Sequence, residues 1–111
     1  MALYMHQWSY KGEQVKQLLL EKADRAEVVR VAVEAFGGTL HSFFYCFGKY
    51  DGVAISEFPD SESALASMLA ITAQGRINFV HTTPLFSPEE GLNAMRNAGD
   101  VIGSRQPPAT P

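Results

Sequence analysis

The chain has 111 residues, of which 46% are hydrophobic, and a formal net charge of −3. This length favours one domain, and a compact chain of this size buries about two thirds of its unfolded surface. The charges are scattered, which argues against a nucleic-acid partner, and no apolar run reaches the roughly 20 residues that span a bilayer. The single cysteine, Cys46, excludes an intrachain disulfide and a cysteine-rich zinc site, and it fits a reducing, cytoplasmic setting.

The first predicted elements are a strand and two helices. Residues 2–10 favour a strand, because aromatic side chains occupy alternate positions. Glu13–Glu21 is then predicted as a short helix. A second helix is predicted to begin at Asp24, which is a suitable N-cap, and to end at Gly37, since glycine accepts the left-handed conformation that follows a helix.

The most apolar stretch, residues 40–58, predicts a β-hairpin. Apolar alternation converges on Gly48 and Lys49 from both sides, which indicates a two-residue turn. Glycine at the first turn position suits the primed turn types that join strands most tightly. Phe47 is then expected to pair with Tyr50, and this pairing sets the register of the hairpin.

This register divides the hairpin between two faces of the sheet. The first face carries Leu40, Ser42, Phe44 and Cys46 opposite Asp51, Val53 and Ile55. The second carries His41, Phe43, Tyr45 and Phe47 opposite Tyr50, Gly52, Ala54 and Ser56. Because Val53 and Ile55 are bulky and apolar, we expect the helices, and a buried Cys46, on the first face. The second face would leave a large aromatic patch exposed, so we expect a second copy to stack on it as a sheet-on-sheet dimer.

After the hairpin, Asp60 is predicted to cap a helix that runs to about Ala73. Residues 76–83 are predicted as the fourth strand, which Pro84 ends. The resulting order of elements, β-α-β-β-α-β with an additional C-terminal helix, predicts an α+β domain of the ferredoxin-like type. Its antiparallel sheet is expected to have the strand order 4-1-3-2.

A capping box at Ser87-Pro88-Glu89-Glu90 predicts a short last helix that ends at about Asn97. Leu92 and Met95 are expected on its inner face. The predicted division of the chain is a single domain over residues 1–100 and a flexible tail over residues 101–111.

The turn region resembles a family signature. Phe47-Gly48-Lys49-Tyr50-Asp51, followed by the strand Gly52-Val53-Ala54-Ile55, is similar to the motif of the GYD-domain family, whose motif residues here are Gly48, Tyr50 and Asp51. The Gly37-Gly38 helix stop, the helix start at Pro59-Asp60 and the late Phe86–Glu90 are also similar, so the resemblance covers Tyr4 to about Met95. It implies a dimeric α/β barrel, mostly bacterial, whose biochemical role is not established. Gly52 departs from the pattern, which has a bulky apolar residue there, and leaves space around Tyr50.

Asp51 is the sharpest candidate for chemistry, because it is a carboxylate at a strand end. The structural alternative is favoured. In the predicted topology the third strand begins beside the end of the first strand, where the first helix starts. A carboxylate at that position accepts backbone N–H groups and complements the helix dipole, so we expect Asp51 to cap the first helix.

The three histidines, His6, His41 and His81, lie on three different predicted strands without the spacing of a metal-binding motif, so no metal site is predicted. His6 and His41 fall on the expected inter-sheet face, where an imidazole could act as an acid or base. Cys46 has no histidine fixed near it by the sequence, which argues against a nucleophile. No Gly-rich phosphate loop or dinucleotide fingerprint appears, and no cofactor is predicted.

The candidate pocket lies on the second face, where small residues of one strand stand opposite large ones. It consists of Tyr4, His6, Trp8, His41, Phe43, Tyr45 and Ser56. The leading hypothesis is a homo-oligomer that binds a small, partly apolar molecule between the sheets, with neither nucleic acid nor membrane as partner. The alternatives are a cofactor-free enzyme of the monooxygenase or isomerase type, by fold analogy, and a purely structural or regulatory subunit.

Overall fold

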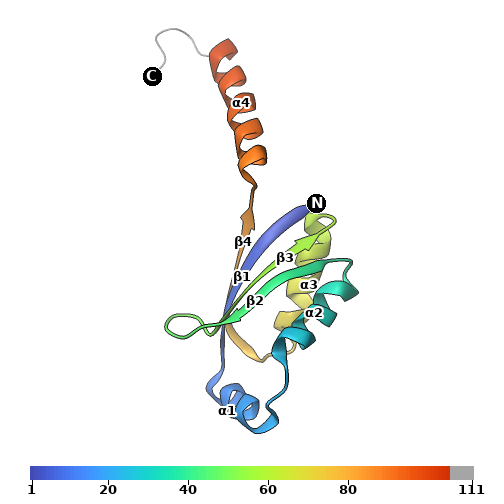
Figure 1. Ribbon diagram of the computed structural model, residues 1–111. Coiled ribbons are helices and arrows are strands. Elements are labelled where there is room, and N and C mark those ends of the chain that lie inside the picture. The colour runs from blue at the N-terminus through green and yellow to red at the C-terminus, as the bar shows by residue number, and fades with distance from the viewer. Residues whose placement is uncertain (106–111) are drawn as a thin grey trace.

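The computed structural model describes residues 1–105 and has an α+β architecture with one open antiparallel sheet (Figure 1). The elements are β1 (Ala2–Tyr10), α1 (Gly12–Glu21), α2 (Arg25–Ala35), β2 (Thr39–Tyr45), β3 (Gly52–Phe58), α3 (Ser61–Ala73), β4 (Ile77–Leu85) and α4 (Pro88–Arg105). The strands lie in the order β2-β3-β1-β4, which reads 4-1-3-2 from the other edge. Among the described residues, no helix has the combined length and apolar character that crossing a bilayer needs.

Three helices begin at side chains that the sequence identifies as caps. Asp24 accepts hydrogen bonds from the first backbone N–H groups of α2, and Asp60 accepts one from Ser63 at 2.8 Å. Ser87 and Glu90 form a reciprocal box, in which Ser87 N donates to Glu90 Oε1 at 2.8 Å and Glu90 N donates to Ser87 Oγ at 3.1 Å. These local signals are confirmed, because each depends only on neighbouring residues.

Helices α2 and α3 cover the face of the sheet that the sequence assigned to a dimer partner. On β3 the buried side chains are those of the face with small residues, and Val53 and Ile55 are only half-buried on the open face. The reason is steric. Ala54 and Ser56 take little room beneath the helices, and Phe58 completes a core on the same face. That core consists of Val33, Phe58 and Ala64, with Tyr4, Val29 and Phe36 packed against it.

The connection between β2 and β3 is longer than predicted. The strands end at Tyr45 and resume at Gly52, so residues 46–51 form a loop and the two-residue turn is wrong. The register beside the loop is nevertheless the predicted one, because Tyr45 lies opposite Gly52 and Phe43 lies opposite Ala54. The backbone N–H of Cys46 donates to the carbonyl of Asp51 at 3.0 Å, which continues this register into the loop.

The register of β2 shifts at His41, between Leu40 and Ser42. A bulge of this kind adds one residue to a strand and reverses the faces of the residues beyond it. Leu40 therefore lies opposite Ser56, on the side that the helices cover, where the sequence placed His41. The exposed His41 ring instead forms a 2.7 Å hydrogen bond with Glu57.

Strand β4 and helix α4 both extend beyond their predicted ends. β4 continues through Pro84 to Leu85, which an edge strand tolerates because one side of its backbone needs no partner. Helix α4 passes Asn97 and includes residues 101–105 of the predicted tail, and residues 106–111 lie outside the described chain. It projects away from the sheet (Figure 1), and the molecule measures 65 × 29 × 23 Å. The predicted inner face of this helix is therefore uncovered, with Met95 70% exposed.

Candidate functional site

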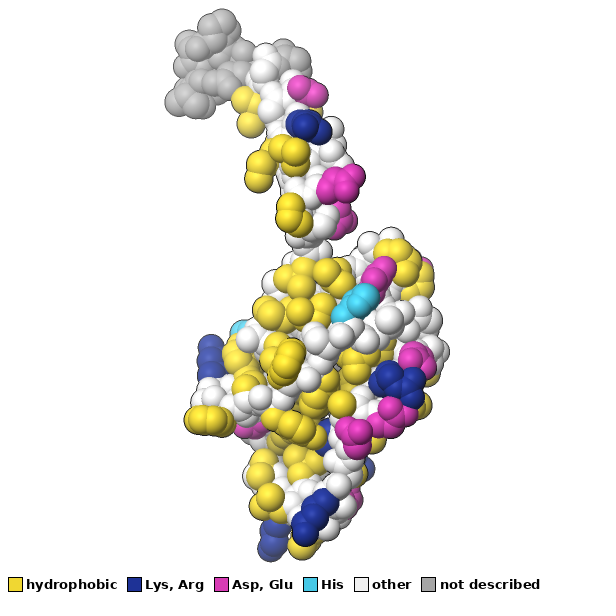
Figure 2. All heavy atoms as spheres, viewed as in Figure 1, with side chains coloured by type: hydrophobic (Ala, Val, Ile, Leu, Met, Phe, Trp, Pro, Cys, Tyr) yellow, Lys and Arg dark blue, Asp and Glu magenta, His cyan; other side chains and the backbone are white. Residues whose placement is uncertain are grey.

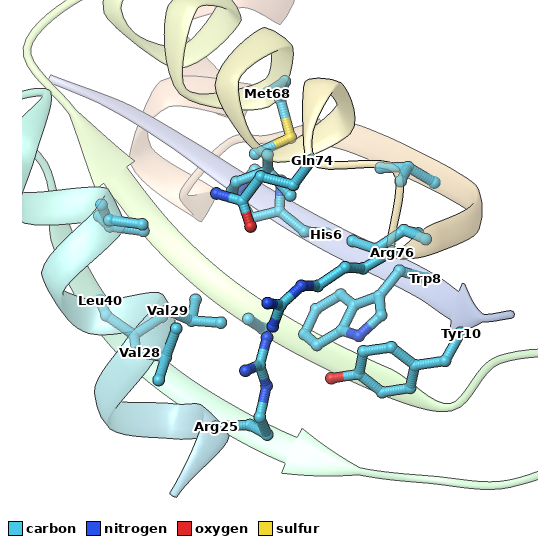
Figure 3. A pocket seen from close by; sticks show the side chains of 16 residues that line it. His6, Trp8, Tyr10, Arg25, Val28, Val29, Leu40, Met68, Gln74 and Arg76 are labelled. Atoms are coloured by element: carbon cyan, nitrogen blue, oxygen red, sulfur yellow. The ribbon is translucent and has the colours of Figure 1, made fainter. Parts of the chain in front are cut away.

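A cavity of about 80 Å³ lies between the sheet and the helices α2 and α3 (Figure 3). Its walls are mainly apolar and include Val28, Val29, Ala32, Leu40, Met68 and Ile71. One water molecule needs roughly 10–15 Å³ of such space, so this cavity has room for a small organic group. Its apolar residues come from the helices α2 and α3 on one side and from the strands of the sheet on the other.

Five polar or amphipathic side chains complete the lining: His6 and Tyr10 from β1, Arg25 from the start of α2, and Gln74 and Arg76 from the segment before β4. Figure 3 shows the side chains of Arg25 and Arg76 pointing toward one another beside Trp8 and Tyr10. The site thus combines an apolar interior with two guanidinium groups.

His6 is held by a chain of hydrogen bonds beneath the helices. The hydroxyl of Thr82 donates to Met68 Sδ at 3.2 Å, so its oxygen accepts from His6 Nδ1 at 3.2 Å. The other ring nitrogen, Nε2, then accepts from the hydroxyl of Ser56 at 2.5 Å. Burial lowers the pKa of His6 from 6.5 to about 4, so the ring is neutral at pH 7. Both ring nitrogens are therefore engaged within the protein.

Trp8 closes one wall of the cavity and begins a row of aromatic rings. It is 5% exposed, and its ring centroid lies 5.5 Å from that of Phe43. Phe43 in turn meets Tyr45 edge-on at 5.2 Å. Tyr45 is exposed, so this row leads from the cavity toward the hairpin loop.

The structure brings together only part of the predicted pocket. His6 and Trp8 line the cavity, whereas Phe43 and Tyr45 lie outside its lining. Ser56 takes part through its hydrogen bond to His6. Tyr4 packs edge-on against Phe58 in the core, with ring centroids 6.2 Å apart. His41 lies at the bulge, is exposed, and is not among the residues that line this cavity.

Sequence reasoning missed the helix wall and the two arginines. The apolar stripe of α2, which includes Val29 and Val33, was recognisable as a buried face. No sequence pattern pointed to Arg25 or Arg76, because each is a single charged residue at the end of a helix or strand. Only the fold brings them to one place.

Asp51 ties the hairpin to the end of β1. Its Oδ2 accepts a hydrogen bond from the backbone N–H of Tyr10 at 2.9 Å, and its own N–H donates to the carbonyl of Trp8 at 2.8 Å. The expected cap on the first helix is wrong, since the N-cap of α1 is Lys11. Asp51 instead holds the strand that carries the aromatic lining, which is a structural role.

The neighbouring motif residues also serve the loop. Tyr50 Oη hydrogen-bonds to His81 Nδ1 at 2.8 Å, and Gly48 has a φ of 117°, which favours glycine. Ser9 Oγ donates to the carbonyl of Lys49 at 2.9 Å. The loop of residues 46–51 is therefore bound to β1 and β4 by several hydrogen bonds.

Cys46 is exposed in this loop, so its predicted burial under the helices is wrong. Its thiol donates to the carbonyl of Tyr50 at 3.3 Å. Within residues 1–105, no three His, Cys, Asp or Glu side chains lie close enough together to bind a metal ion.

Comparison with known families gives a match over residues 4–95, to the family described as GYD domain. The match covers the stretch over which the sequence resembles that family. The comparison with curated proteins found no match.

Proposed function

The chain belongs to the GYD-domain family, and we propose that it acts as a homodimer whose subunits each bind a small, partly apolar molecule. The proposed site is the cavity under α2 and α3. It therefore differs from the predicted site between two sheets, because the small-residue face is the one that the helices cover.

One observation carries the binding proposal: an apolar cavity beneath two helices that has a few polar groups on one side. Small-molecule sites are usually of this kind, since apolar walls supply affinity and a few polar groups fix orientation. A domain of this size ordinarily packs its interior densely, so space for a small organic group is unusual.

Binding is favoured over catalysis by the state of His6. An acid or base needs a ring nitrogen within reach of a substrate proton. Both nitrogens of His6 are occupied by Ser56 and Thr82, and the low pKa keeps the ring neutral. We therefore assign His6 a structural role on the cavity floor.

Trp8, the single tryptophan of the chain, lines the cavity and can report on its occupancy by fluorescence. We expect titration with octanoate or octanamide to give a saturable change in its emission. Ala32→Leu places extra volume in the cavity and should abolish that change while the protein stays folded. Ala35→Leu, at an exposed position of the same helix, is the matched control and should leave it intact. The binding proposal fails if neither compound gives a saturable change in the wild type.

Two uncovered apolar surfaces support the homodimer. One is the open face of the sheet, where Phe44 is 63% exposed beside the half-buried Val53 and Ile55. The other is α4, where Figure 2 shows hydrophobic side chains along one side and charged ones along the other. The exposed apolar residues of that helix are Leu92, Met95, Val101 and Ile102. In proteins, most of the stability of a helix comes from the packing of its apolar face against a partner.

A second copy of the chain is the occupant that covers both surfaces at once. Twofold pairing places the same surface of each subunit against the other and leaves no open end. It also agrees with the dimeric α/β barrel that the family resemblance implies, although the interface residues differ from those expected for a sheet-on-sheet dimer.

The proposed setting is the reducing cytoplasm. Cys46 is an exposed thiol in a loop. Exposed thiols persist where glutathione and thioredoxin keep them reduced, and outside the cell they are readily oxidised.

A further inference from the structure

We propose that the ligand is an amphipathic carboxylate, whose anionic head lies between Arg25 and Arg76 and whose apolar part enters the cavity. This inference rests on the proposed function and adds the chemical class of the ligand. The guanidinium group is planar and carries several N–H donors. The two guanidinium groups can therefore together hold both oxygens of a carboxylate.

The two arginines converge from distant parts of the chain. Arg25 is the first residue of α2, and Arg76 precedes β4. Both line the cavity and also a smaller pocket beside it, and their side chains point toward one another (Figure 3). Two like charges repel, and the repulsion is stronger beside an apolar wall than in water. An anion between them would turn this repulsion into two favourable contacts.

The donors of Arg25 indicate a missing acceptor. Its Nε is buried and has no hydrogen-bond partner within residues 1–105. Leaving a buried donor of a charged group unsatisfied is costly, so such a group usually has a partner. By contrast Arg30, on the same helix, hydrogen-bonds to Glu27 at 2.9 Å and to Glu34 at 2.7 Å. In the described part of the chain, neither Arg25 nor Arg76 forms an ion pair of this kind.

Glu21 is the carboxylate that lines the smaller pocket beside the two arginines. Its Oε1 accepts a hydrogen bond from Gln17 Nε2 at 2.8 Å. Among the residues that line the two pockets, two arginines and one glutamate leave an excess of one positive charge. Glu21 therefore competes with a ligand carboxylate without cancelling the charge that attracts it.

The rest of the lining explains why the ligand must also be apolar. Behind the arginines, Val28 and Val29 come from α2, and Met68 and Ile71 come from α3. Inorganic anions would gain nothing from these walls, whereas an alkyl or aryl group would bury apolar surface against them.

Octanoate and octanamide test this inference, because they share a chain length and differ by one negative charge. Trp8 fluorescence gives both affinities. We expect octanoate to bind the wild type about tenfold more tightly than octanamide, the change expected from one charge-assisted contact. Arg25→Gln and Arg76→Gln should each weaken octanoate binding about tenfold and leave octanamide unchanged. Arg76 is exposed, so its replacement removes no core packing and keeps the test valid if Arg25→Gln folds poorly.

Two further variants complete the design. Glu21→Gln removes the competing carboxylate and should strengthen octanoate binding alone. Arg96→Gln, on α4 and away from the cavity, is the control and should change neither affinity. Equal binding of both compounds to the wild type would overturn the inference while the proposed function stands. No saturable binding of either compound would overturn both.

Discussion

The indole of Trp8 lies directly against Gly52, its partner across the β1–β3 ladder. A Cβ atom on residue 52 would stand 2.4 Å from Cζ2 of Trp8, closer than any real contact. Gly52 is also the position at which the sequence resemblance leads us to expect a bulky apolar residue. The space that a bulky residue would fill is occupied by Trp8, which thereby forms one wall of the proposed site.

Gly52→Ala should therefore disturb both stability and the site. The new methyl group forces Trp8 or the strand to move, and overpacking of this kind costs about 1–3 kcal/mol. Chemical denaturation followed by circular dichroism measures the loss, and Trp8 emission should shift in the native state. Gly12→Ala is the matched control, because no atom lies within 4 Å of the added carbon there. An unchanged midpoint and emission for Gly52→Ala would contradict the contact.

His6 predicts a pH dependence of stability. Its pKa falls from 6.5 in the unfolded chain to about 4 in the folded protein. Below pH 6.5 the unfolded chain takes up a proton that the folded protein does not bind until about pH 4, so the free energy of unfolding falls over this interval. The loss is on the order of 3 kcal/mol at the lower end, and none arises from His6 above pH 6.5.

The measurement compares the wild type with His6→Gln, because carboxylates also titrate near pH 4. The difference in unfolding free energy between the two proteins should change by this amount from pH 6.5 to pH 4. Parallel stability curves for the two proteins would show that His6 is protonated as readily in the folded state as in the unfolded one.

The sequence was sufficient for the features that depend on neighbouring residues. The caps at Asp24, Asp60 and Ser87 and the register beside Gly52 follow from local hydrogen bonding and from the alternation of side chains. The sequence did not show which face of the sheet the helices cover, because both faces of the hairpin are apolar. It depended on how closely helices can approach small residues, and on Phe58.

The site was only partly predictable for a related reason. His6 and Trp8 were placed in a pocket by their alternation along one strand. Arg25 and Arg76 are about half the chain apart in sequence, and no periodicity connects them. The bulge at His41 likewise shifts the register of β2 by one residue, so the side chains beyond it change faces of the sheet. Nothing in the residue types around the bulge signals this shift.

Asp51→Asn tests the structural role of the motif. The substitution weakens the acceptor for the Tyr10 N–H, and the loss of a charged acceptor should lower stability by about 1 kcal/mol. Trp8 emission and octanamide binding of the folded protein should stay close to those of the wild type. A wild-type melting temperature together with abolished binding would assign Asp51 to the site instead.

The dimer can be tested through helix α4. Met95 is 70% exposed in one subunit, and a partner that covers it would be repelled by a charge at that position. We expect the wild type to sediment as a dimer at micromolar concentration and Met95→Glu to shift toward the monomer. Asn93→Glu adds the same charge two residues before Met95, on the opposite side of the helix, so it should leave the dimer intact. If the wild type sediments as a monomer, both apolar surfaces are exposed in solution and the proposed dimer is wrong. If Met95→Glu stays dimeric, the open sheet face carries the interface without α4.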